Sequence, residues 1–75
     1  MKFMESEELL TRLRDQISKC RKAKGLTREK LAYGVGLSKG TISKIENGCR
    51  DIRFSTLYKI AESLDIKLKE LVDFY

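Results

Sequence analysis

The sequence predicts an all-α domain of five short helices, and three observations support that prediction. Proline is absent from the 75 residues, so no residue removes a backbone donor from a helix interior. Apolar residues recur at spacings of three and four, which is typical of helices that bury one face. Two segments follow Thr27 and Ser38, residue types whose side-chain oxygens cap the first backbone N–H groups of a helix.

The first helix is expected to begin near Ser6 and to end before Gly25. Glutamates follow Ser6 in the first turn, where the helix dipole favours negative charge. Glycine suits the position just after a helix because it adopts the left-handed conformation easily. One face of the segment is apolar and is predicted to be buried: Leu9, Leu13, Ile17 and Cys20. Leu10 lies beside this face, and the first turns are free to pack on the C-terminal helix or on a second subunit.

Residues 27–47 are predicted to form two short helices joined by a tight turn. The first covers 28–33, and the turn is expected to lie around Gly34 and Gly36. Two helices joined by three or four residues that include glycine form a helix-turn-helix unit, whose second helix fits the major groove of DNA. The prediction is specific because caps, buried pairs and the turn glycine fall in register: Thr27, Leu31, Ala32, Gly36, Leu37, Ser38, Ile42 and Ile45.

Two more helices are predicted after this unit. The apolar positions of the fourth are Leu57, Ile60, Ala61 and Leu64, and those of the fifth are Leu68, Leu71, Val72 and Tyr75. Asp65, between them, is expected in the left-handed conformation, which aspartate tolerates. The fifth helix has two interpretations: it packs against the first helix, or it forms the seam of a homodimer through Leu71, Phe74 and Tyr75.

Positive charge is concentrated around the predicted helix-turn-helix unit. The chain carries 16 Lys and Arg against 11 Asp and Glu, a net charge of +5. Residues 19–53 alone hold ten basic and three acidic residues, whereas each flank has a net charge of −1. A surface that binds a polyanion needs this kind of distribution. The alternative is a solvated basic face that has no partner.

Composition narrows the other function classes. The chain has no histidine, and its two cysteines, Cys20 and Cys49, do not have the spacing of a metal site or a disulfide framework. We expect no cofactor and no metal, and an enzyme is not expected because paired carboxylates and a phosphate-binding loop are absent. The lengths of the apolar runs predict neither a signal peptide nor a membrane span, so we expect a cytoplasmic protein. Cys20 is expected in the core. Cys49, in a basic loop, is either an ordinary thiol or a redox-sensitive one.

The residues from Ile17 to Leu71 resemble the Cro and phage-repressor class of DNA-binding domains, often called XRE-like. The matching motifs are RKAKGLT at 21–27, the Leu31–Ala32 pair, GLS at 36–38, ISKIENG at 42–48 and TLYKIAESLDIKLKEL at 56–71. The resemblance implies a compact five-helix bundle of the phage-repressor type, with the helix-turn-helix formed by helices 2 and 3. We expect residues 1–75 to be a single such domain, without room for a separate sensing domain.

The resemblance also implies roles for individual residues. Positions that meet base edges in the family, or lie next to them, correspond to Lys39, Gly40, Thr41, Ser43 and Lys44, with Lys44 open to reading a base or binding a phosphate. Phosphate contacts are expected from Arg28, Asn47, Arg50 and Arg53. Gly40 stands where the family usually has a longer polar residue, and either a close approach of the backbone to DNA or chance explains the difference. Arg53 stands where many relatives have a capping serine. Arg21 and Glu46 are expected to form a structural ion pair beneath the second helix of the motif.

The predicted function is sequence-specific regulation of transcription by a homodimer on a palindromic operator. The protein would act as a repressor, or as an autoregulatory controller that contacts RNA polymerase, as in restriction–modification systems. Two alternatives remain. An antitoxin would co-purify with a toxin partner, and a protein-interaction module would show no salt-dependent DNA binding.

Overall fold

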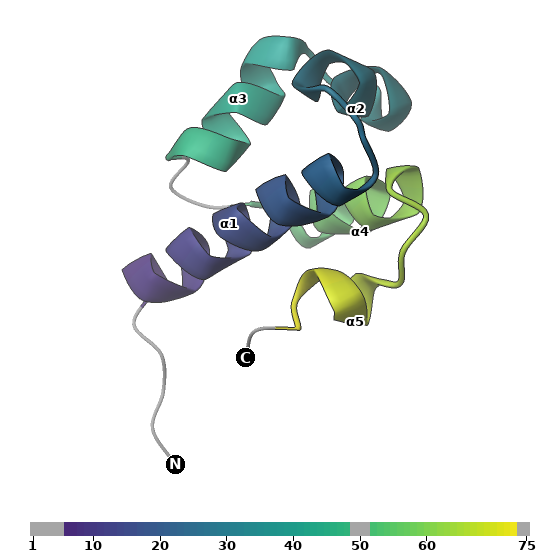
Figure 1. Ribbon diagram of the computed structural model, residues 1–75. Helices are drawn as coiled ribbons and strands as arrows, with labels where there is room; N and C mark the ends of the chain where they lie inside the picture. Colours follow the sequence, from purple (N-terminus) through teal and green to yellow (C-terminus); the bar gives the residue numbers. More distant parts are fainter. Residues whose placement is uncertain (1–5, 49–51, 74–75) are drawn as a thin grey trace.

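The computed structural model describes residues 6–48 and 52–73, and these residues form five α-helices and no strand. The helices are α1 (Ser6–Ala23), α2 (Arg28–Val35), α3 (Lys39–Asn47), α4 (Phe54–Ser63) and α5 (Leu68–Leu71). The all-α prediction is confirmed, and so are the expected start of α1 and the caps of α2 and α3. Figure 1 shows the long α1 crossing the fold, with α2 and α3 above it, α4 behind its C-terminal half and α5 below.

The core lies where the apolar faces of these helices meet. Helix α1 packs against α3 and α5, while α2 packs against α3 and α4 (Figure 1). The buried apolar side chains in the described residues come from every helix: Leu13, Ile17, Leu31, Ala32, Val35, Ile42, Ile45, Ile60, Ala61 and Leu71, together with Leu64 just after α4. Most of these positions were predicted from spacing alone, because a stripe repeating every three or four residues has one face to bury.

Helix α1 ends as the sequence predicts. Gly25 has a φ of 69°, and the N–H of Leu26 donates to the carbonyl of Arg21 at 3.1 Å. This geometry is a Schellman motif, in which a left-handed residue lets the chain satisfy the last carbonyls of a helix. Cys20 packs against the core, as expected, and burial raises the pKa of its thiol.

The turn after α2 was expected around Gly34 and Gly36, and the structure corrects this expectation at Gly34. The helix continues to Val35, so Gly34 is a helical residue and only Gly36, with a φ of 77°, makes the left-handed turn. A Cβ atom at position 34 would overlap the hydroxyl oxygen of Ser63 on α4. Gly34 therefore permits the close approach of α2 and α4, a tertiary requirement that its neighbours in the sequence do not reveal.

The C-terminal helix is shorter than its apolar pattern predicts. Helix α5 ends at Leu71, and Val72, predicted on its buried face, is 36% exposed. The side-chain amide of Gln16 on α1 donates to the carbonyl of Glu70 at 3.0 Å, so α5 packs against α1 within one chain. Asp65 has a φ of 56°, as predicted.

One residue assigned to a dimer seam is instead a core residue. Leu71 is 0% exposed within a single chain, because the α1–α5 packing encloses it, so its side chain has no surface to present to a second subunit. The other two predicted seam residues, Phe74 and Tyr75, lie outside the described residues.

Candidate nucleic-acid interface

Helix α3 is anchored by two isoleucines, and this anchoring decides which side chains it presents to solvent. Ile42 is 0% exposed and Ile45 is 6% exposed, as the sequence predicted. The five residues expected to contact bases are all accessible: Lys39, Gly40 and Lys44 are exposed, and Thr41 and Ser43 are half-buried. The described structure thus places an accessible polar side of α3 opposite its buried side.

The first turn of α3 is held by Ser38. Its hydroxyl oxygen accepts a hydrogen bond from the backbone N–H of Thr41 at 3.1 Å, which is the expected N-cap. The hydroxyl of Thr41 also lies 2.9 Å from the hydroxyl of Ser38. Two side chains therefore fix the conformation of the chain where it enters α3.

A buried carboxylate lies beneath α3. The side chain of Glu46 is 1% exposed and accepts hydrogen bonds from the guanidinium of Arg21 at 2.8 and 3.2 Å. Arg21 is also buried, and it donates to the carbonyl of Leu26 at 2.7 Å. The structure contains the predicted pair, and its two parallel N–H···O bonds have the fork geometry that makes arginine–carboxylate pairs strong.

Arg28 has a second partner that the sequence did not predict. Its Nε donates to Oε1 of Glu46 at 3.2 Å, so one carboxylate accepts from arginines of both α1 and α2. The side chain of Arg28 is 36% exposed, against 9% for Arg21. Arg28 therefore remains accessible to a ligand, and its predicted contact with a phosphate stays a prediction.

The amino-terminal ends of α2 and α3 flank a shallow depression of about 420 Å³. Three of its lining residues are cations, Arg21, Arg28 and Lys39, and the other two are Thr27 and Glu29. Glu29 forms an ion pair with Lys39 at 3.1 Å, and both side chains are more than half exposed. Because such an exposed pair contributes little stability, Lys39 is free to exchange this carboxylate for another anion.

A second depression, of about 290 Å³, runs along α3 from the turn before the helix to Ile45. Its lining joins α3 to the start of α4: Leu37, Thr41, Lys44, Ile45, Ile52, Arg53 and Thr56. Arg53 is exposed and is the N-cap residue of α4, and its side chain makes no capping hydrogen bond. This was expected, because Arg53 stands in place of a capping serine. Asn47 is also exposed, at the end of α3. Cys49 and Arg50 lie outside the described residues, so their expected roles stay predictions.

The helix-turn-helix family model matches residues 17–71, which are the limits of the resemblance seen in the sequence. The chain belongs to the helix-turn-helix family. The family comprises DNA-binding regulators of transcription of the Cro and phage-repressor type, and it is not a class of enzymes.

Restriction–modification controller proteins are prominent among the relatives of this helix-turn-helix chain. Control protein C.BamHI of Bacillus amyloliquefaciens is 37% identical over 49 residues, which are 65% of this chain and 60% of that protein. The controller C.AhdI of Aeromonas hydrophila is 34% identical, with a TM-score of 0.78 over 83% of this chain and 94% of that one. A nucleoprotein complex of C.Esp1396I matches with a TM-score of 0.76 and 28% identity over the whole of both chains.

Several accessible residues were not singled out from the sequence. Glu29 was not predicted to hold Lys39, because a contact between separate helices has no signal in spacing. Tyr33, Phe54 and Tyr58 are 90%, 71% and 54% exposed. The sequence held a signal for the exposure of Phe54 and Tyr58. They are four residues apart and so share a face of α4, and this face differs from the apolar face that was predicted to be buried.

The described residues lack a metal-binding cluster and a membrane-spanning helix. They contain no group of three or more Cys, Asp or Glu side chains placed to hold a metal ion. No helix among them has the length and apolar character needed to cross a membrane.

Proposed function

We propose that the protein is a sequence-specific DNA-binding regulator of transcription, which binds a palindromic operator as a homodimer. The observation that carries this proposal is the placement of α3: two buried isoleucines hold it against the core, and its accessible polar side borders two depressions that contain cations. Membership of the helix-turn-helix family and likeness to restriction–modification controller proteins support the same function.

In this proposal α3 enters the major groove and the residues at its two ends position it. Arg28 at the start of α2 would bind a phosphate, and Asn47, Arg50 and Arg53 would bind the backbone beyond the other end. Contacts to phosphates fix the orientation of a protein on the duplex, whereas contacts to base edges carry the sequence information. Base contacts would come from the accessible side of α3: Lys39, Gly40, Thr41, Ser43 and Lys44.

The first test separates positioning from reading. Arg28→Gln removes a charge but keeps a side chain that can donate to Glu46, so we expect weaker binding to every DNA sequence. The slope of log affinity against log salt should fall by about one, because one phosphate contact fewer releases about one counterion fewer. Arg12→Gln is the matched control, since Arg12 is an exposed arginine paired with Glu8 on α1.

Changes within α3 should behave differently in the same measurements. Lys39→Ala and Thr41→Ala should alter the bases preferred in site selection and should cost roughly 1–3 kcal/mol on the preferred operator. A changed preference in Arg28→Gln, with unchanged preferences in both α3 variants, would reverse the roles we assign to the two helices.

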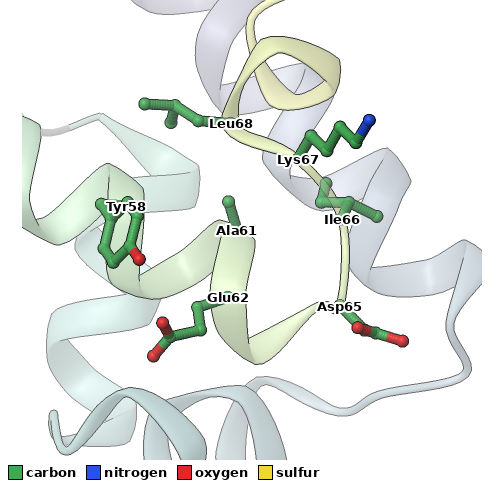
Figure 2. Close-up of a pocket in the computed structure, with 7 residues that line it drawn as sticks. All are labelled: Tyr58, Ala61, Glu62, Asp65, Ile66, Lys67 and Leu68. Atoms are coloured by element: carbon green, nitrogen blue, oxygen red, sulfur yellow. The ribbon is translucent and has the colours of Figure 1, made fainter.

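The proposed homodimer needs a surface away from α3, and the exposed apolar side chains supply one. We define the α4–α5 surface by Phe54, Tyr58, Val72 and the depression beside Tyr58. Figure 2 shows this depression, with Tyr58 on one side, Ala61 at its base and the segment of Ile66 to Leu68 on the other. Helix α5 lies on the opposite side of α1 from α3 (Figure 1), so pairing there leaves α3 accessible. Large apolar side chains exposed beside a depression are typical of an interface.

The second test is of assembly. Tyr58→Glu should give folded monomers in sedimentation experiments, because it puts a charge within the proposed interface. Tyr33→Glu is the control, since Tyr33 is more exposed but lies on α2. The wild-type footprint should contain two half-sites about 34 Å apart. A wild type that stays monomeric at high concentration and on DNA would contradict the proposal.

The regulatory output follows from where the operator lies. We propose repression by occlusion of RNA polymerase, or autoregulation by a controller that also contacts the polymerase, and no catalytic activity. Binding to chromosomal DNA would place the protein on the nucleoid in the cytoplasm. The identity of the neighbouring genes separates these outputs, since a methyltransferase gene would favour the controller and a toxin gene would favour an antitoxin.

A further inference from the structure

Gly40 occupies the second position of the helix proposed to enter DNA, and nothing in the described fold requires a glycine there. Its φ is not positive, so its backbone conformation is open to any residue. A Cβ atom at this position would meet only the hydroxyl oxygen of Ser38, at 3.9 Å, which is ordinary van der Waals contact. Gly40 differs in this from Gly34, where Ser63 fills the space, and from Gly36, where the turn needs a positive φ.

Glycine also weakens a helix relative to alanine, because it loses more backbone freedom on folding. At an exposed position with room for a methyl group, alanine would therefore stabilise the free protein. The absence of a side chain at position 40 brings no benefit to the folded protein itself, so any benefit must come from contact with a partner. On the accessible side of α3, Gly40 lets the backbone come closer to a partner than any other residue type.

The groups around Gly40 indicate the chemistry of that contact. Gly40 itself offers a CH₂ group and no side-chain donor. The hydroxyl of the next residue, Thr41, lies 2.9 Å from that of Ser38, so one of its hydrogen-bonding positions is used within the chain, and the side chain also carries a methyl group. The first turn of α3 thus contains two apolar groups, the CH₂ of Gly40 and the methyl of Thr41. In the major groove, the apolar group on the base edges is the 5-methyl of thymine.

We propose that Gly40 is a specificity-determining residue, which admits a thymine methyl group against the backbone of α3 beside Thr41. The inference rests on the proposed function, since it specifies what α3 reads in the operator. A side chain at position 40 would occupy the space of the methyl group and hold α3 away from the base pair.

The test combines a protein variant with a change in the DNA. The operator is first selected from random duplexes with the wild-type protein, and each thymine is then replaced by deoxyuridine, which lacks only the 5-methyl. Replacement of one particular thymine in each half-site should weaken the binding of the wild-type protein about fourfold per half-site. This is the effect on affinity of exposing one buried methyl group. Gly40→Ala should bind the thymine operator at least tenfold more weakly, and the same deoxyuridine replacement should no longer weaken its binding.

Thermal denaturation provides the control for folding. Gly40→Ala should melt a few degrees above the wild type, so that weaker binding is not a result of unfolding. Ser55→Ala is the matched variant, because Ser55 is the exposed second residue of α4 and should gain helix stability without losing affinity.

Three outcomes would contradict the inference: Gly40→Ala binds the operator as tightly as wild type, no deoxyuridine position affects wild-type binding, or Gly40→Ala stays sensitive to the same deoxyuridine. Failure of the proposed function is distinguishable from all three, because the wild type would then select no sequence from random DNA.

Discussion

Glu46→Ala should be among the most damaging single substitutions in this protein. Removal of the carboxylate leaves the guanidinium of Arg21 buried with only the carbonyl of Leu26 as a described partner. Loss of one member of a buried ion pair typically costs about 3–5 kcal/mol, because the remaining charge is neither hydrated nor compensated. Small domains have total stabilities of only about 5–15 kcal/mol, so thermal and urea denaturation should both show a large loss.

The shared carboxylate makes the two sides of this pair unequal. Arg21→Ala should cost less than Glu46→Ala, because Glu46 keeps its bond from Arg28. The double variant should be less damaged than the sum of the single variants, since the second change removes the charge that the first left unpaired. Strict additivity, or an Arg21 variant that is the less stable of the two, would contradict this account of the network.

Leu71→Ala should destabilise each subunit rather than separate two subunits. Its side chain is 0% exposed within one chain, and truncation of a buried leucine typically costs about 2–5 kcal/mol through lost transfer energy and a residual cavity. Unfolding by urea and sedimentation of the remaining folded protein measure the two effects separately. Leu68→Ala is the control, because Leu68 is in the same helix but only partly buried and should cost less.

The result that would contradict the core assignment is a stable, folded monomer of Leu71→Ala. That outcome would place the side chain in an interface between subunits. A destabilised protein whose folded fraction keeps the assembly state of the wild type would support the assignment.

The sequence predicted local features well where one short segment contains the physical cause. Thr27 and Ser38 cap their helices because a cap needs only a side-chain oxygen and a backbone N–H three residues later. Gly25 and Gly36 end helices through their own φ, which no distant residue has to permit. The candidate base-contacting residues are accessible as predicted because Ile42 and Ile45 fix the rotation of α3 from within the same helix.

The fifth helix shows where a local pattern stops being sufficient. The stripe that begins at Leu68 predicts a helix as far as Tyr75, yet the helix ends at Leu71. Spacing tells which residues would share a face if the helix continued, but the packing of α5 on α1 decides how many turns are enclosed. Leu71 was placed in a seam for the same reason: a stripe does not distinguish a face buried within one chain from a face buried between two.

By itself, the sequence determined the all-α class, most helix boundaries, the caps and the buried face of α3, and the family resemblance added the pairing of Arg21 with Glu46. Only the tertiary structure decided that Arg28 shares the carboxylate of Glu46, that Lys39 is held by Glu29, that Gly34 faces Ser63, and that Gly40 has room for a methyl group. The reason is physical: caps, turns and apolar periodicity depend on neighbours within about one helical turn. A shared partner or an empty space depends on how separate helices cross, and that crossing is set by the packing of the whole core.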